Sequence, residues 1–239
     1  MYLSRLILNP RCRAVQNDLA DCQAMHRTVM SLFGQVGGEG ARAALGVLHR
    51  LEIDNHGGRL RLLVQSAERP DFTHLPANYL AATTEPNPEC KPLDEAYRSL
   101  RAGRTLRFRL LANPTRKIDT KSSPEGKRNN GQRVPLRHEK DQLAWLARKA
   151  EASGFRLRQV AASPPGEGTA QVPAVRASPA GRLGQPPRRT SPGSRITVEA
   201  VLFEGLLEVT DAEALRAALA VGIGPGKAYG CGLLSVAPA

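Results

Sequence analysis

The sequence has few aromatic residues and no long apolar run. Phe, Trp and Tyr make up 4% of it, so a core has to rest on aliphatic side chains, and we do not expect base stacking to dominate a contact with nucleic acid. No apolar run approaches the roughly 18 residues that cross a membrane, and no N-terminal stretch has the order of a signal peptide. We therefore expect a globular, cytoplasmic protein.

Cysteines are also few, and they are not paired along the chain. Cys12, Cys22, Cys90 and Cys231 lack the spacing of a zinc knuckle or a disulfide framework. No carboxylate pair and no His-Asp cluster has the spacing of metal ligands, which disfavours a two-metal nuclease. We predict that the protein needs no metal and no other cofactor.

Acidic residues are outnumbered by basic ones. The chain has 34 Lys and Arg residues against 22 Asp and Glu residues, which gives a net charge of +12 and a pI near 10.2. Such an excess attracts polyanions, so nucleic acid is the first partner to consider. Arg outnumbers Lys 27 to 7, and a guanidinium holds phosphate through two parallel hydrogen bonds. A GC-rich genome would explain this ratio equally well, but it would not explain the net charge.

Three quarters of the excess charge lies in residues 98–133, which include eleven cations and two carboxylates. We predict that a strand with Arg107 and Arg109 on one face, together with the loop that follows, binds the phosphates that line an RNA groove. The cations of the loop are Arg116, Lys117, Lys121, Lys127, Arg128 and Arg133. The alternative is a basic loop that is merely solvated.

Apolar patterning predicts the same order of elements in both halves of the chain. In the first half we expect a strand at Tyr2–Leu8, an irregular Arg-bearing loop, a helix from residue 23 and a strand hairpin at 47–53 and 59–65. A further helix and strand must then lie within 72–92 to complete a βαββαβ unit.

The second half restarts after Gly103 with the same kinds of element. The predicted strands are 104–111, 155–160, 195–209 and 231–236, and the predicted helices are 139–152 and 211–220. Thr210 or Asp211 should cap the second of these helices, and Gly205 should kink the long strand. We therefore predict an N-terminal domain at 1–98 and a C-terminal domain at 103–239.

Residues 161–194 interrupt the second domain. They contain seven prolines and five glycines without an aromatic residue, a composition that cannot bury enough apolar surface to offset chain ordering. We predict a flexible insertion. Its arginines could follow an RNA backbone, although a solvated linker is the preferred interpretation.

Of the five histidines, His26 is the best candidate for catalysis. It lies in the first turns of the first helix, next to Arg27, so an imidazole and a guanidinium could reach one phosphate together. A lone histidine is more often structural, and the other four belong to an inward strand face, a turn, a loop and a helix entry. These four are His49, His56, His74 and His138.

Five glycines fall within residues 222–232, between the last helix and the last strand. The order of strand, loop, Lys-Ser/Thr and helix that defines a nucleotide-binding P-loop is absent. Glycines let a backbone approach another molecule closely, so we predict RNA contacts at Gly224, Gly226 and Lys227. A tight structural turn is the alternative.

Several segments, taken in order, resemble the CasE family, the repeat-processing endoribonucleases of the type I-E CRISPR complex called Cascade. The resemblance covers nearly the whole chain and combines six segments, none of which is specific alone. They are Met1-Tyr2-Leu3-Ser4, Met25-His26-Arg27, residues 108–114, Ala144-Trp145-Leu146, Phe203-Glu204-Gly205 and residues 222–238.

The resemblance implies a fold and an activity. The fold is α+β, with two tandem ferredoxin-like (RRM-like) domains and antiparallel sheets, which agrees with the repeated element order. The activity is metal-independent cleavage of CRISPR repeat RNA at the base of a stem-loop, by a ribose 2′-hydroxyl attack that leaves a 2′,3′-cyclic phosphate and a 5′-hydroxyl. His26 is then the general acid or base, and the implied partners are the crRNA stem-loop and other Cascade subunits.

One residue departs from the family pattern. Family members commonly carry a Tyr three residues before the histidine, where this chain has Gln23. Glutamine can orient a ribose or phosphate but cannot shuttle a proton, so Arg27 would have to supply charge stabilisation if the tyrosine transfers protons. The alternative functions are a non-catalytic subunit that caps the guide RNA hairpin and, more distantly, a DNA-binding protein.

Overall fold

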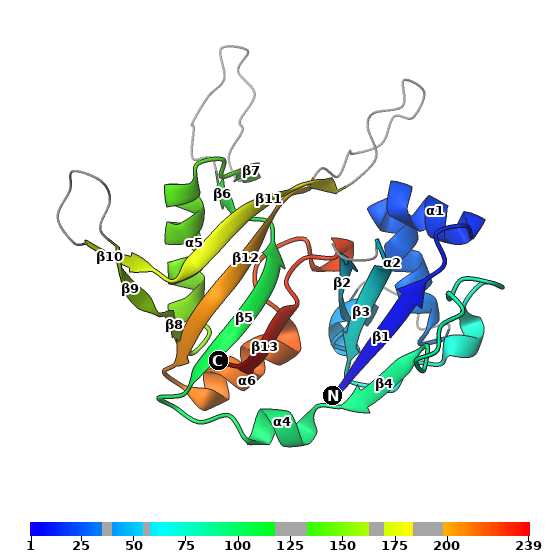
Figure 1. The fold of residues 1–239 in the computed structure, drawn as a ribbon, viewed down its shortest axis with the longest axis horizontal. Helices are drawn as coiled ribbons and strands as arrows, with labels where there is room; N and C mark the ends of the chain where they lie inside the picture. The colour runs from blue at the N-terminus through cyan, green and yellow to red at the C-terminus, as the bar shows by residue number, and fades with distance from the viewer. Residues whose placement is uncertain (35–39, 55–57, 118–132, 163–169, 184–197) are drawn as a thin grey trace, which may run out of the picture.

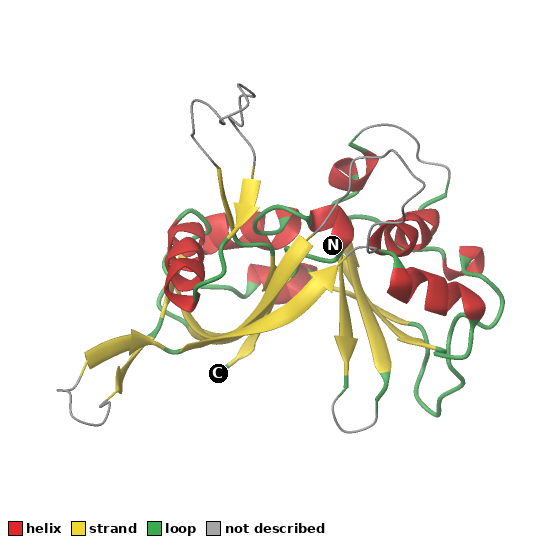
Figure 2. Cartoon of the chain, turned by 90° about the horizontal axis from the view of Figure 1, so that it is seen from above, coloured by secondary structure: helices red, strands yellow, loops and turns green. Residues whose placement is uncertain are grey.

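The computed structural model describes residues 1–34, 40–54, 58–117, 133–162, 170–183 and 198–239. Two antiparallel sheets stand side by side, one from each half of the chain (Figure 1). Seen from above, the helices lie on one side of these sheets (Figure 2). No helix within the described ranges is long and apolar enough to cross a membrane.

The first sheet has the strand order β2-β3-β1-β4. Its strands are β1 (Tyr2–Leu8), β2 (Leu48–Ile53), β3 (Leu60–Ser66) and β4 (Glu89–Pro92). In the central strand β1, Leu6 and Leu8 are buried on one face, and Leu6 lies opposite Leu62 of β3. The predicted strands of this half are therefore present, with β4 completing the sheet.

The helices in the described part of this domain are α1 (Arg13–Ala20), α2 (Cys22–Ser31) and the short α3 (Ala41–Ala44). One of them corrects the prediction. α2 is the predicted helix, whereas α1 replaces the irregular loop that we expected. α1 buries Asp18 beside Val15, and Asp18 accepts a 2.7 Å hydrogen bond from the Tyr79 hydroxyl. A residue distant in sequence thus satisfies the polar side chain that α1 buries.

The helix expected within 72–92 is also different. That segment contains a single 3-10 turn, η1 (Phe72–His74), before β4. Three prolines between positions 76 and 88 interrupt it, and each removes a backbone donor that a helix requires.

The second sheet has the strand order β11-β12-β5-β13, and β8 also pairs with β12. Its strands are β5 (Thr105–Ala112), β8 (Phe155–Leu157), β11 (Val175–Leu183), β12 (Val198–Val209) and β13 (Leu234–Pro238). Helices α5 (Glu139–Glu151) and α6 (Ala212–Val221) cover one face, where Trp145 stacks on Phe203 with ring centroids 6.3 Å apart. Asp211 caps α6, as predicted, by accepting from two backbone N–H groups.

Part of the predicted flexible insertion is folded. β9 (Gln159–Ala162) and β10 (Ala170–Pro173) form a hairpin, and β11 pairs with β12 along its length. The prediction is wrong for 170–183, because long-range pairing offsets a composition that is unfavourable locally. Pro179, which cannot donate to a ladder, sits beside a bulge on the edge strand β11. Residues 163–169 and 184–194 lie outside the described ranges.

Gly205 marks the place where β12 exchanges one neighbour for another. Its register partner on β11 is Val175, and two residues later Leu207 pairs with β8. A Cβ at Gly205 would lie 2.2 Å from the Ala174 carbonyl oxygen. The glycine therefore permits a close backbone crossing at the position where we predicted a kink.

The linker and a polar cluster join the domains. The linker contains α4 (Asp94–Arg98), and its Tyr97 hydroxyl donates to Gln65 Oε1 at 2.8 Å. Gln65 Nε2 then donates to the Leu219 carbonyl of the second domain at 2.7 Å. These two bonds connect β3, the linker and α6.

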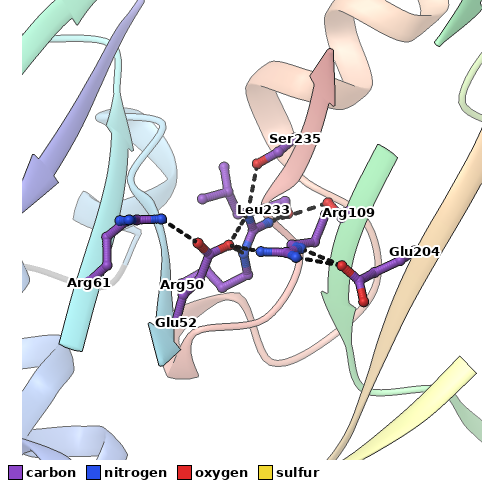
Figure 3. Close-up of polar contacts among 7 residues, drawn as sticks. All are labelled: Arg50, Glu52, Arg61, Arg109, Glu204, Leu233 and Ser235. Atoms are coloured by element: carbon purple, nitrogen blue, oxygen red, sulfur yellow. Dashed lines mark hydrogen bonds and ion pairs between the residues drawn. The ribbon is translucent and has the colours of Figure 1, made fainter. Parts of the chain in front are cut away.

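The polar cluster lies between the two sheets, and we call it the interdomain latch (Figure 3). It consists of Arg50, Glu52, Arg109 and Glu204. Arg50 Nη2 lies 2.8 Å from Glu52 Oε1, and Arg50 Nη1 donates to the Leu233 carbonyl at 2.8 Å. Arg109 donates to Glu52 at 3.2 Å and to Glu204 at 2.7 Å. One arginine from each domain therefore shares the Glu52 carboxylate.

Candidate active site and basic groove

His26 lies on α2, in a position fixed by the start of that helix. The Asp21 side chain caps the helix by accepting a 2.9 Å hydrogen bond from the Gln23 backbone N–H. Met25 faces the core, which leaves His26 partly exposed at the border of the buried face. Gln23 is exposed and lies three residues before His26, so both side chains occupy the same side of the helix.

The environment of His26 is cationic. Partial burial, followed by the positive charges of Arg42 and Arg27, lowers the pKa of His26 below its usual value. The lowered pKa favours the neutral imidazole, which is the form that accepts a proton. Arg27 is 69% exposed, and its Nη2 lies 4.0 Å from Asp21 Oδ2, so its guanidinium is only weakly held.

Two further side chains approach this region from α3 and β2. His49 is 2% exposed, in agreement with the inward strand face predicted for it. Burial, followed by the charges of His26 and Arg42, lowers the pKa of His49 to about 3. Arg42 is partly buried, and its Nη1 donates to the Val47 carbonyl at 2.9 Å. No sequence pattern marks Arg42, because a four-residue helix carries no apolar stripe.

The glycine-rich loop brings the second domain against α2. Its 3-10 turn, η2 (Lys227–Tyr229), packs against α2 and β2. Gly222 has a φ of +82°, and a Cβ there would lie 2.8 Å from the Leu48 side chain of β2. The glycine thus permits both the left-handed backbone and the close contact between domains.

A groove of about 660 Å³ runs between the β6–β7 hairpin, α5 and the glycine-rich loop. The hairpin consists of β6 (Thr115–Lys117) and β7 (Arg133–Pro135) and projects from the second domain (Figure 1). We call this groove the basic groove, since its described lining includes six cations and no carboxylate. The cations are Arg116, Lys117, Arg133, Arg148, Lys149 and Lys227. Such a lining attracts phosphate groups.

Lys227 connects the basic groove with the histidine. Its side chain lines the groove, while its own turn η2 packs against α2. Burial, followed by the charges of Arg42 and Lys149, lowers the pKa of Lys227. The turn η2 therefore joins the basic groove to the helix that carries His26.

The basic groove gathers several residues that we predicted for RNA binding. These are Arg116, Lys117, Arg133, Gly224 and Lys227. Arg148 and Lys149 were missed, because cations in the last turn of a helix are already accounted for by the helix dipole. The pattern that could have revealed them is that both are basic and adjacent on one exposed turn of α5. The predicted residues Lys121, Lys127 and Arg128 lie outside the described ranges.

The remaining predicted residues lie elsewhere or have another role. Arg107 and Arg109 project from the face of β5 opposite α5, since Phe108 between them is buried with α5. Arg107 Nε donates to the Pro238 carbonyl at 2.9 Å, and Arg109 belongs to the interdomain latch. Gly226 is not among the residues that line the groove.

Gly224 lines the groove, but its lack of a side chain also serves internal packing. A Cβ at Gly224 would lie 2.9 Å from the Trp145 ring. The tight structural turn that we considered as an alternative therefore explains this glycine at least as well as access for RNA.

The described ranges contain no group of three His, Cys, Asp or Glu side chains that could hold a metal ion. The four cysteines are all free thiols.

Comparisons with known proteins extend over the whole chain. A family model described as CRISPR associated protein matches residues 1–238. The chain is 36% identical over 238 residues to the CRISPR-associated endoribonuclease Cse3 of Thermus thermophilus, with 100% of both chains covered. It is 32% identical over 240 residues to the CRISPR system Cascade subunit CasE of Escherichia coli, again with 100% of both covered.

Solved structures show the same likeness in three dimensions. Cse3 bound to a 19-nucleotide RNA superposes with a TM-score of 0.78 at 36% identity, over 100% of both chains. Cas6e of Escherichia coli superposes with a TM-score of 0.66 at 27% identity, also over 100% of both. The predicted α+β fold with two ferredoxin-like domains is thereby confirmed.

Proposed function

Because the chain belongs to the CRISPR-associated protein family that includes Cse3 and CasE, we propose that it is an endoribonuclease that cuts CRISPR repeat RNA at the base of a stem-loop and holds the product within Cascade. The observation that carries this proposal is that η2, whose Lys227 lines the basic groove, packs against α2, the helix that carries the partly exposed His26. The groove suits a structured polyphosphate, and the imidazole suits proton transfer at one phosphate.

The proposed reaction is a transesterification within the RNA. The ribose 2′-oxygen loses its proton to His26 and forms a bond to the adjacent phosphorus, while the bond from phosphorus to the 5′-oxygen breaks. The 5′-oxygen takes up a proton from water as it leaves, and His26 then returns its own proton to the solvent, so the products are a 2′,3′-cyclic phosphate and a 5′-hydroxyl. No metal ion takes part in these bond changes, because an imidazole can supply the proton transfer.

Gln23 and Arg27 flank His26 in this scheme. The Gln23 amide donates hydrogen bonds that orient the ribose or the phosphate, since it lies on the same side of α2 as His26. Arg27 is exposed and adds positive charge at the entrance to the site. Neither residue transfers a proton.

The product stays bound because cleavage leaves the contacts of the stem unchanged. The cations of the basic groove hold backbone phosphates on one side of the scissile bond, so these contacts are the same before and after the reaction. This retention suits a protein that presents a guide RNA hairpin to other Cascade subunits.

A second candidate function rests on Gln23. A chain without the family tyrosine could cap the guide RNA hairpin without cutting it, and another nuclease would then process the repeat. This protein would still use the basic groove, so RNA binding alone does not separate the two functions.

The test is cleavage of the host's own CRISPR repeat RNA in EDTA. We expect wild-type protein to cut this RNA, and we expect His26→Ala to lower the single-turnover rate by about 10³-fold while the Kd stays within about twofold. Arg98→Ala is the matched control, since Arg98 is exposed on α4. Intact RNA held for hours by wild-type protein would favour the non-catalytic function, and a need for divalent metal would overturn the proposed chemistry.

A deoxyribose at the nucleotide before the scissile phosphate tests the nucleophile. The substitution removes the attacking 2′-hydroxyl, so cleavage should stop while binding continues. A DNA-binding protein would show no preference for the repeat RNA over DNA of the same sequence.

A further inference from the structure

The glycine-rich loop borders a second hollow besides the basic groove. It is a cleft of about 400 Å³ between the two domains, and we call it the interdomain cleft. Its lining includes Cys22 and Met25 of α2, His49 of β2, Leu111 of β5 and Tyr229 of η2. The helix that carries His26 and the last residue of η2 therefore border one cavity.

His26 stands at the rim of the interdomain cleft. It follows Cys22 by four residues on α2, and side chains at that spacing are neighbours on a helix surface, with Cβ atoms about 5–6 Å apart. Cys22 lines the cleft, and the His26 side chain beside it is partly exposed. Since η2 packs against the same helix, a ligand that enters the cleft between α2 and η2 comes close to the imidazole.

The turn η2 presents one polar side chain to each hollow. Lys227 lines the basic groove, and Tyr229 lines the interdomain cleft. Two residues advance about 4 Å along a 3-10 turn, which is close to the rise of roughly 3.4 Å per nucleotide in one strand of a duplex. An RNA strand that is held in the groove at Lys227 can therefore place its next backbone unit at Tyr229.

Tyr229 is held in place by its surroundings. Its ring packs against a buried cluster that includes Leu111, and its backbone N–H donates to the Gly226 carbonyl at 2.9 Å. The next residue, Gly230, has a φ of +86°, and a Cβ there would lie 3.6 Å from His49 Nε2. Packing on the second domain and the close approach of the turn to β2 thus position the phenol before any RNA binds.

The hydroxyl of Tyr229 differs in its setting from two other tyrosine hydroxyls. Tyr79 donates to Asp18 at 2.7 Å, and Tyr97 donates to Gln65 at 2.8 Å, so both serve the interior of the protein. Tyr229 lines the interdomain cleft, where a ligand can reach it. Burial raises the pKa of Tyr229 above its usual value, which keeps the phenol protonated and able to donate a hydrogen bond.

We propose that Tyr229 is a catalytic residue of this nuclease, whose hydroxyl donates a hydrogen bond to a nonbridging oxygen of the scissile phosphate. The hydroxyl approaches the phosphate from η2, and His26 approaches it from α2. Tyr229 transfers no proton. It fixes the phosphorus relative to the attacking 2′-oxygen, and its hydrogen bond strengthens as negative charge builds on the nonbridging oxygens. This inference rests on the proposed function, because it names a second group at the same scissile bond.

The first test removes the hydroxyl and keeps the ring. At saturating protein we expect Tyr229→Phe to lower the single-turnover rate on repeat RNA by about 10- to 100-fold, as for the loss of one hydrogen bond to a charged oxygen, while the Kd stays within about twofold. Tyr2→Phe is the matched control, because neither Tyr2 nor its register partners Ser66 and Pro92 line the interdomain cleft. Equal rates for the two variants would overturn the role of the Tyr229 hydroxyl.

Sulfur substitution at the scissile phosphate tests the contact itself. Sulfur accepts hydrogen bonds more weakly than oxygen, so sulfur at the oxygen that Tyr229 contacts should slow the wild type and should slow Tyr229→Phe much less. Both diastereomers are measured, because only one of them places sulfur at that oxygen. Sulfur effects that match between wild type and Tyr229→Phe for both diastereomers would show that the hydroxyl does not contact the phosphate.

Tyr229→Ala separates the hydroxyl from the packing of the ring. It removes the contacts with the cluster around Leu111, so we expect it to unfold at a lower temperature, whereas Tyr229→Phe should unfold with the wild type. If Tyr229→Phe cut as fast as the wild type and Tyr229→Ala were slow, the residue would act through packing alone and the proposal would fail.

The outcomes separate this inference from the proposed function. Wild-type protein that leaves repeat RNA intact sinks the proposed function and this inference with it. Wild-type protein that cuts, with Tyr229→Phe as fast as Tyr2→Phe, overturns only the role of Tyr229 and leaves the nuclease standing.

Discussion

The basic groove and the interdomain latch both contain arginines that the sequence predicts to bind RNA. The two regions differ in whether carboxylates lie next to these arginines. In the latch, Arg109 lies between Glu52 and Glu204 (Figure 3). In the groove, Arg116 and Arg133 face other cations, and the described lining includes no carboxylate. The comparison teaches that the role of an arginine depends on which carboxylates the fold brings to it, and a count of charge along the chain cannot show this.

The largest expected effect comes from breaking the latch. Glu52→Gln leaves Arg50, which is 2% exposed, without its carboxylate, and we expect a loss of about 3 kcal/mol in the free energy of unfolding. Affinity for RNA should change by less than about twofold if the latch is purely structural. Urea denaturation measures the first quantity, and Glu68→Gln at an exposed position is the control. Equal stability of the two variants would show that the latch contributes nothing.

The next effect comes from neutralising the groove. The double variant Arg148→Ala, Lys149→Ala should weaken RNA binding about 30-fold near physiological salt, and it should make the slope of log K against log salt shallower by about 2. The matched control is Arg156→Ala, Arg158→Ala, since these two arginines both pair with Glu208. If the control variant lost as much affinity as the test variant, pairing with carboxylates would not decide which cations bind RNA.

His49 extends the comparison to a buried basic side chain that has no carboxylate beside it. It is buried next to Arg50, and no ion pair found in the described part of the chain joins it to a carboxylate. The folded protein keeps this imidazole neutral down to a pKa of about 3, whereas the unfolded chain takes up a proton near pH 6.5. Stability should therefore fall as pH falls below about 6.5, and the wild type should lose about 1 kcal/mol more than His49→Gln between pH 7 and 5.5. Chemical denaturation at both pH values measures the difference. Identical pH dependence in the two proteins would mean that His49 is not kept neutral.

The smallest effect should come from Arg107. It lies on the face of β5 opposite α5 and donates to the Pro238 carbonyl at 2.9 Å, so Arg107→Ala should change RNA affinity by less than about twofold. A tenfold loss would restore the RNA-binding role that its sequence context predicts and would place RNA on both faces of the second sheet.

Much of the fold could be predicted because its signals are local. The alternation of residues 105–111 and the apolar stripe of α5 give β5 and α5 nearly to their ends. α1 could not be predicted, since its buried polar residue Asp18 is satisfied by Tyr79, 61 positions later. β11 was missed for the same reason, because a segment rich in Pro and Gly becomes a strand only when β12 supplies the hydrogen bonds.

The candidate site was predictable only where a motif marks it. His26 and the glycine-rich loop are recognisable in sequence, and the structure brings η2 of that loop against α2. No local sequence pattern marks Arg148 or Lys149, since each is an ordinary basic residue of a helix, and only the fold brings the glycine-rich loop beside them. The density of basic residues along the sequence predicted part of the groove. It could not show that Arg107 and Arg109 lie on the face of β5 opposite α5.

Lys227 and two of the partners of Arg50, Leu233 and Ser235, come late in the chain, whereas the candidate catalytic histidine is at position 26. Both halves of the chain must therefore be synthesised before the basic groove can form beside the helix of His26. A nascent chain that has folded only its first domain would carry the imidazole without the groove, and it should leave cellular RNA uncut while translation continues.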